Sequence, residues 1–135
     1  MKLLMFQARR FAFAPHPADG SDACAASRAE LRDAAVVFVH AEAEDEPRRA
    51  AVLSRIVKNI KWLANKRGLR RVVLHSFSHL SESKSSPAFA GPLIDDAAER
   101  LRGAGYEVST TPFGRSCAWE LDVYGEPVAK VFKSI

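Results

Sequence analysis

The side chains best suited to chemistry in this chain lie in a short polar segment that follows an apolar run. After the apolar residues 72–74, the chain places His75 and His79 among serines at positions 76, 78 and 81. Imidazole accepts or donates a proton near neutral pH, and hydroxyl groups orient bound molecules through hydrogen bonds. Because functional residues commonly lie where a rigid strand ends, this segment predicts the floor of a small-substrate site.

The two histidines carry different expectations. His79 follows the strand, so we expect it to position a substrate or to transfer a proton. His75 lies within the strand, where a histidine is more often a hydrogen-bonded core or interface residue, and the same holds for His40. No metal and no cofactor are expected, since Cys24 and Cys117 are too few for a cysteine-rich zinc site.

Cys117 offers a second kind of chemistry. A thiolate paired with His79 could attack an ester or a thioester as a nucleophile. Cys117 also alternates with Trp119 and Leu121 along an expected apolar strand face, where a cysteine is commonly inert. The inert role is the favoured interpretation.

The elements that position these residues follow from the pattern of apolar residues. Alternating or continuous apolar runs predict strands, and apolar residues three or four apart predict helices. The expected strands are 2–6, 11–13, 34–41, 72–75, 106–110, 117–123 and 128–132, and the expected helices are 47–67 and 87–103. Gly91-Pro92 predicts a kink or a later start in the second helix. Pro15, Pro17 and Gly20 predict a break, and residues 21–32 a weak helix or a loop, so residues 15–33 receive no role.

Composition and charge limit the class of protein. With 135 residues, 47% of them hydrophobic and 27% charged, we expect one globular domain, and no apolar run is long enough for a membrane helix. Reduced cysteines and a cytoplasmic location are expected. The net charge is +4, and nine of the twenty basic residues lie between Arg48 and Arg71 without an acidic residue among them. Such a stripe favours contact with a polyanion such as RNA.

Several short motifs also occur in a fixed order. They are the Lys2–Met5 strand, the basic helix, Ser78-His79-Leu80-Ser81, Pro87, Gly105–Val108, Pro112-Phe113-Gly114 and Gly125-Glu126-Pro127. Their order over nearly the whole chain resembles the editing domain of archaeal-type threonyl-tRNA synthetases. The resemblance implies a single editing-like domain over residues 1–135. Its expected fold is that of D-aminoacyl-tRNA deacylases: a compact α/β domain with a mixed β-sheet and two main helices.

The resemblance also implies an activity. Editing domains of this family hydrolyse the ester that joins a wrongly attached serine to the terminal adenosine of threonine tRNA. Serine and threonine differ by one methyl group, worth only about 1–3 kcal/mol in a binding pocket, so a second pocket must supply the remaining discrimination. We expect a free-standing aminoacyl-tRNA deacylase that acts in trans in translation fidelity, binds the aminoacylated 3′ end, forms a homodimer, and has a synthetase as a further candidate partner.

Site residues are carried over by position. The family's histidine corresponds to His79, and its backbone groups before that histidine correspond to Phe77 and Ser78. The substrate-binding residues expected in all are Gln7, Ser76, Phe77, Ser78, Phe113, Gly114 and Ser116. The tRNA-binding residues expected are Arg9, Arg10, Arg55, Lys58, Lys61, Arg115 and Lys130.

This chain departs from the family at three places. Cys117 stands where the family has a lysine that points into the site, and Lys130 stands where it has a glutamate. His75-Ser76 replaces an aromatic-proline pair. A thiol cannot fix a water molecule or an ester oxygen as an ammonium group does. The alternative is therefore a catalytically inactive relative that serves as a tRNA- or protein-binding module.

Overall fold

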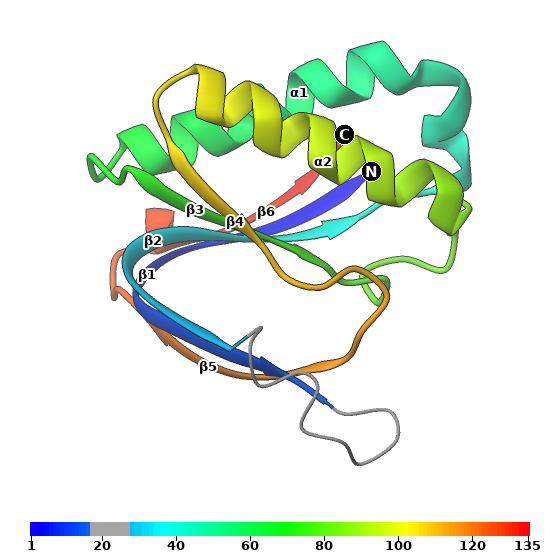
Figure 1. Cartoon of the computed structure of the whole chain (residues 1–135). Helices are drawn as coiled ribbons and strands as arrows, with labels where there is room; N and C mark the ends of the chain where they lie inside the picture. The colour runs from blue at the N-terminus through cyan, green and yellow to red at the C-terminus, as the bar shows by residue number, and fades with distance from the viewer. Residues whose placement is uncertain (17–27) are drawn as a thin grey trace.

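The computed structural model describes residues 1–16 and 28–135, which fold into one layer of sheet and one layer of helices (Figure 1). The strands are β1 (Lys2–Pro15), β2 (Ala29–His40), β3 (Arg71–Ser76), β4 (Glu107–Thr110), β5 (Cys117–Val123) and β6 (Lys130–Ser134). The helices are α1 (Arg49–Asn65) and α2 (Pro87–Gly103), with short 3-10 helices η2 (Ala43–Arg48) and η3 (Pro127–Ala129).

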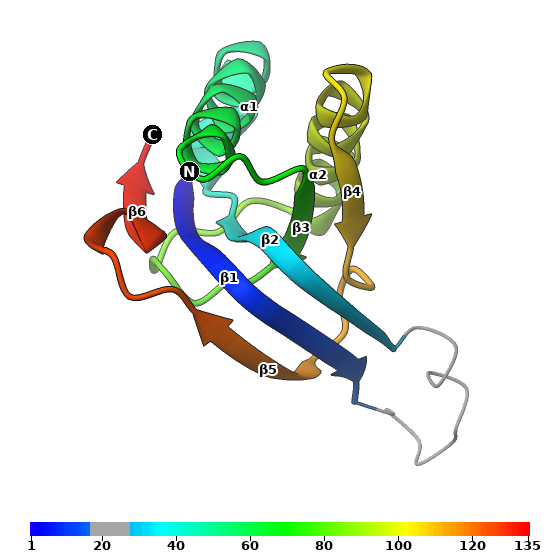
Figure 2. The ribbon, with the colours of Figure 1, turned by 90° about the vertical axis from the view of Figure 1, so that its left-hand side faces the viewer.

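The described residues form a six-stranded mixed sheet in the order β4-β3-β2-β1-β5, with β6 also paired to β1. The pairs β2–β3 and β3–β4 are parallel, and β1 is antiparallel to each of its partners. A parallel pair needs a crossover, which α1 supplies between β2 and β3 and α2 supplies between β3 and β4. Both helices consequently cover the same face of the sheet (Figures 1 and 2).

Each face of the sheet carries its own core. Successive strand residues point to opposite faces, so Leu74 faces the helices while Val73 faces away from them. The helix-side core includes Ile56, Leu63, Leu93 and Leu101 from the two helices. The opposite core is rich in aromatic residues and lies on the face of the sheet that points away from the helices. Its buried members, from β1, β2 and β3, are Ala8, Phe11, Phe13, Ala34, Val36, Phe38 and Val73.

The N-terminal strand is one element, whereas the sequence predicts two. β1 stays extended because it has partners along most of its length: β2 throughout, β6 along its first half and β5 along its second. The predicted break at 7–10 coincides instead with a shift of register against β5 between Ala8 and Arg10. Pro15 is the last residue of β1, so the strand ends where the sequence predicts the break to begin.

The expectation of a weak helix or loop at 21–32 is wrong for its last residues. Ala29 and Leu31 belong to β2 and lie opposite Phe13 and Phe11 of β1. Cross-strand packing outweighs the helical preference of alanine there. Residues 17–27, which include Pro17, Gly20 and Cys24, lie outside the described residues.

The helices differ from expectation mainly at their beginnings. Residues 43–48 form η2, and α1 starts at Arg49, two residues later than expected. α2 runs from Pro87 to Gly103 with Pro92 inside it, so the expected later start is wrong; the one bond that Pro92 cannot donate is to the carbonyl of Ala88, in the first turn. The side chain of Ser86 caps α2 by accepting a hydrogen bond from the N–H of Phe89 at 3.2 Å. The last strand starts at Lys130, after η3.

Candidate functional site

The segment after β3 and the loop before β5 together enclose a pocket of about 300 Å³. One side comes from the end of β3 and the residues that follow it, and the other from the β4–β5 loop and the start of β5. The lining residues are His75, Ser76, Phe77, Ser78, His79, Gly114, Arg115, Ser116, Cys117 and Trp119. The pocket thus brings together most of the residues that the sequence predicts for the site, from two segments far apart in the chain.

The His79 side of the pocket is held by the end of β2. The N–H of Phe77 donates to the carbonyl of Val39 at 3.0 Å, which extends the pairing of β3 with β2. Beyond it, the N–H of Leu80 donates to Nδ1 of His40 at 2.9 Å, and Nε2 of His40 lies 2.7 Å from the carbonyl of Ser83. His40, expected to be structural, therefore fastens the loop that carries His79.

Glu42 fastens the same loop through charge. Its carboxylate accepts a hydrogen bond from the hydroxyl of Ser81 at 2.7 Å, pairs with the amino group of Met1 and lies 3.1 Å from Nζ of Lys2. Burial opposes ionisation of this carboxyl, but the hydrogen bonds from Met1, Ser81 and Lys2 outweigh it and lower the pKa of Glu42 to about 2. Asp45 joins the cluster, 2.9 Å from the amino group of Met1.

Backbone donors are available beside His79. The N–H of Phe77 is used in the sheet, so the role expected for the backbone of Phe77 and Ser78 rests on their other backbone groups and stays a prediction. Among the described residues, none accepts a hydrogen bond from the N–H of Ser78 or His79. Two neighbouring N–H groups at a pocket can hold an anion or a developing oxyanion.

The side chain of His79 is exposed. Its ring meets the ring of Phe77 edge to face with 5.1 Å between centroids. Within the described part of the chain no hydrogen bond occupies either ring nitrogen. His79 lines the pocket with its ring exposed, and its expected role toward a substrate stays a prediction.

His75, in the segment predicted to form the floor of the site, is a hydrogen-bonded core residue as expected and also lines the pocket. Its Nδ1 lies 2.7 Å from the hydroxyl of Thr111, and its ring packs against Phe38 at 5.0 Å between centroids. The residue is 4% exposed, and burial lowers the pKa of its imidazole. The signal available in the sequence was strand alternation, which puts His75 on the same face as Phe77 and His79.

The opposite side of the pocket is a loop tied to the end of β1. The N–H of His16 donates to the carbonyl of Ser116 at 2.7 Å, and the guanidinium of Arg115 donates back to the carbonyl of His16 at 3.1 Å. Gly114 adopts a φ of +75°, a backbone conformation that residues other than glycine rarely adopt. Cys117 is partly buried against the aromatic core, and its Sγ lies 3.8 Å from the carbonyl of Arg115.

Some predicted substrate-binding residues lie elsewhere. Phe113 lines a neighbouring pocket with Ser76 and packs against Gly91. Gln7 is fully buried: its Nε2 donates to the carbonyl of Leu63 at 2.9 Å, and its Oε1 accepts from Arg67 at 3.1 Å. Gln7 therefore lies between β1 and α1 and does not line the pocket.

The predicted tRNA-binding residues divide into three groups. Arg115 lines the pocket. On β1, Arg9 is ion-paired with Asp122, and Arg10 is ion-paired with Glu30 and Glu120. Lys130 donates to the carbonyl of Gly125 at 3.3 Å. None of these three basic residues lines the pocket. Arg55, Lys58 and Lys61 lie on α1, on the other side of the sheet from the aromatic core.

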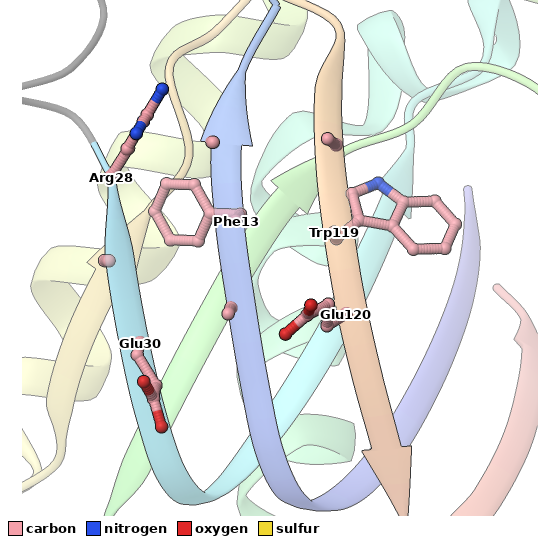
Figure 3. Close-up of a pocket in the computed structure, with 9 residues that line it drawn as sticks. Phe13, Arg28, Glu30, Trp119 and Glu120 are labelled. Carbon is pink, nitrogen blue, oxygen red and sulfur yellow. The ribbon is translucent and has the colours of Figure 1, made fainter.

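A larger hollow, of about 490 Å³, lies over β1, β2 and β5 near Phe13 and Trp119 (Figure 3). Its base consists of alanine side chains from the three strands. In Figure 3, Glu30 on β2 and Glu120 on β5 lie on either side of β1, and both carboxylates pair with Arg10. Hydrogen bonding to Arg10 lowers the pKa of Glu30. The described residues that line the hollow include no imidazole, thiol or hydroxyl group, so we place the chemistry in the smaller pocket.

Two further findings concern the described residues as a set. No cluster of three or more histidine, cysteine, aspartate or glutamate side chains in residues 1–16 and 28–135 is arranged to hold a metal ion. No helix in those ranges is long and apolar enough to span a membrane.

Comparison with solved structures bears on the fold. A structure described as c-Myc DNA unwinding element binding protein superposes with a TM-score of 0.74 and covers 100% of this chain and 99% of its own. With 11% sequence identity, the likeness shows the fold alone. The expected compact α/β domain with a mixed β-sheet and two main helices is thereby confirmed.

Comparison of sequences shows the family. The chain is 32% identical over 105 residues to the threonine–tRNA ligase of Thermococcus kodakarensis and 35% identical over 101 residues to that of Nanoarchaeum equitans. These matches cover 78% and 73% of this chain, and the match to the ligase of Thermofilum pendens, at 28% identity, covers 100%. The chain spans only 17%, 16% and 22% of the three ligases. A family model described as the archaea-specific editing domain of threonyl-tRNA synthetase matches residues 1–135. The chain therefore belongs to this family of editing domains.

Proposed function

We propose that this chain hydrolyses the ester of a mischarged aminoacyl-tRNA, of the type of serine attached to threonine tRNA, and that it does so in trans. One observation carries the proposal: His79, the N–H groups of Ser78 and His79, which have no acceptor among the described residues, and the loop from Gly114 to Cys117 belong to one pocket. All these groups lie within this domain.

The residues of the pocket have distinct roles in this proposal. The N–H groups of Ser78 and His79 bind the carbonyl oxygen of the ester as charge develops on it. The ring of His79 holds the amino acid or the attacking water molecule. Ser76 and Ser116 supply hydroxyl groups for the amino acid, and Arg115 lies where it can meet the phosphate of the terminal nucleotide.

Contact with the rest of the tRNA falls to α1. Arg55 and Lys58 are exposed on the helix and Lys61 is partly exposed, on the opposite side of the sheet from the aromatic core. They bind phosphates distant from the 3′ end, which gives an affinity that depends on salt and not on sequence. A homodimer also belongs to this proposal and is tested by light scattering of the purified chain.

A matched panel of substrates tests the activity. The purified chain is incubated with Ser-tRNA(Thr), Thr-tRNA(Thr) and other charged tRNAs, and loss of the ester is followed over time. We expect faster loss from Ser-tRNA(Thr) than from Thr-tRNA(Thr), and a large reduction in His79→Ala. If no charged tRNA loses its amino acid faster than in buffer, the hydrolase proposal fails.

Cys117 favours a second candidate function. It lines the pocket at the position where the family resemblance expects a lysine, and a thiol cannot supply that positive charge. The second candidate is a binding module for tRNA that has lost hydrolysis. Tight binding of charged tRNA without ester loss selects this candidate, and Cys117→Lys then restores hydrolysis.

A further inference from the structure

Two buried histidines lie near the pocket, and their hydrogen bonds differ. His40 uses both ring nitrogens, one as an acceptor from the N–H of Leu80 and the other beside the carbonyl of Ser83. His75 uses only Nδ1, which lies 2.7 Å from the hydroxyl of Thr111. His40 thus has no nitrogen left for a ligand, whereas His75 has one.

The remaining nitrogen of His75 faces the pocket. His75 is among the lining residues, although it is only 4% exposed. No buried side-chain nitrogen or oxygen of the described residues lacks a hydrogen-bond partner, so Nε2, which has none among them, is not fully enclosed; the pocket that His75 lines is the space open to it. The rings of Phe38 and Phe77 flank the imidazole, at 5.0 and 6.1 Å between centroids, and limit its movement.

We propose that His75 is the general base of this pocket, with Nδ1 donating to Thr111 and Nε2 taking a proton from the attacking water. The inference rests on the proposed hydrolase function. As Nε2 takes the proton, the water oxygen bonds to the ester carbon and the carbonyl electrons move to oxygen. When the intermediate collapses, the bond to the ribose oxygen breaks and that oxygen receives the proton from Nε2. The products are the amino acid and tRNA with a free terminal hydroxyl group.

His75 suits this role better than the other titratable groups of the pocket. An effective base is held in one tautomer and orientation by a third group, and Thr111 does this for His75. The exposed ring of His79 has no such partner among the described residues. The other described groups on the pocket wall that titrate or carry charge are Arg115 and Cys117. Burial lowers the pKa of His75, which keeps its imidazole neutral, and thus able to accept a proton, at neutral pH.

The test compares His75→Gln, Thr111→Val and the matched control Thr110→Val on the charged tRNA that the wild-type chain hydrolyses fastest. Single-turnover rates are measured from pH 5 to 9, after subtraction of the uncatalysed rate. We expect a loss of roughly 10²- to 10⁴-fold in His75→Gln with little change in substrate affinity. Thr111→Val should be slower than wild type, and its activity should persist to lower pH, because the imidazolium loses a hydrogen-bond acceptor. Thr110→Val, which carries the same change one residue earlier, should match the wild type.

The outcomes separate the two proposals. An inactive wild-type chain refutes the hydrolase function and the role of His75 together. If the wild type is active, and a His75→Gln variant that circular dichroism shows to be folded hydrolyses the ester within threefold of the wild-type rate, only the role of His75 is refuted. If His75→Gln does not fold, Thr111→Val decides: an unchanged pH profile refutes the inference, and a shifted acid limb supports it.

Discussion

Removal of the charge on Glu42 should destabilise the fold by a predictable amount that depends on pH. This carboxylate is 7% exposed and joins the amino group of Met1, Lys2 and the hydroxyl of Ser81. Its pKa falls from an ordinary value of 4.5 to about 2, a difference of about 2.5 units. At about 1.4 kcal/mol per unit, the ionised form contributes about 3 kcal/mol to the free energy of unfolding.

The direction of the pH dependence follows from the lowered pKa. A carboxyl whose folded pKa is below its unfolded value stabilises the fold fully above about pH 4.5, and this contribution is lost as the pH falls toward 2. Glu42→Gln should therefore unfold about 3 kcal/mol more easily than the wild type at pH 7, and the difference should shrink to near zero at about pH 2.

Urea denaturation followed by circular dichroism at pH 7, 4 and 2.5 measures this difference. Glu82→Gln is the matched control, because Glu82 is exposed and follows Ser81 in the loop that Glu42 holds. It should stay within about 0.5 kcal/mol of the wild type at every pH. A Glu42→Gln variant as stable as the wild type at pH 7, or a difference that persists at pH 2.5, would refute the reasoning. Because Ser81 loses a charged partner, the variant should also hydrolyse its substrate more slowly while folded.

Three further predictions concern the loops and the basic helix. Gly114→Ala should cost about 1–2 kcal/mol of stability by thermal denaturation because of its positive φ, whereas Gly125→Ala, which has open space and no positive φ, should be close to neutral. His40→Leu should cost about 2–4 kcal/mol and slow ester hydrolysis, because two backbone groups of the His79 loop lose their partner. Lys58→Ala and Lys61→Ala should each weaken tRNA binding and reduce the slope of log affinity against log salt concentration by about one. Filter binding from about 50 to 200 mM salt measures these slopes, and unchanged slopes would exclude α1 from the tRNA interface.

Much of the architecture could be predicted because its signals are local. The alternation of Cys117, Trp119 and Leu121 predicts β5 with its observed bounds, and the apolar run before His75 predicts β3 within a residue at each end. The continuity of β1 could not be predicted in this way. It depends on β2, β5 and β6, which lie far along the chain, and a local pattern contains no information about such partners.

The site, too, could be predicted from the sequence only in part. His79, Ser78 and the Gly114–Cys117 loop were expected at one site, and the pocket contains them. The sequence places His75 in the segment expected at the site but does not reveal its contact with Thr111, which the parallel pairing of β3 with β4 brings close. Gln7 was expected in the site, whereas its buried amide binds Leu63 and Arg67 on the helix side.

The two sides of the pocket are attached to the molecule differently, and this bears on how such a domain can change in evolution. The His79 side is bonded into the central strand β2 at Val39 and His40, so substitutions there disturb the whole sheet. The loop from Gly114 to Cys117 is attached to the end of β1, through His16 and through the pairing of Cys117 with Pro15. Its residues 114–116 are exposed, so their side chains can change with little disturbance of the core. One side of the pocket can therefore diversify in evolution while the other stays fixed by the sheet.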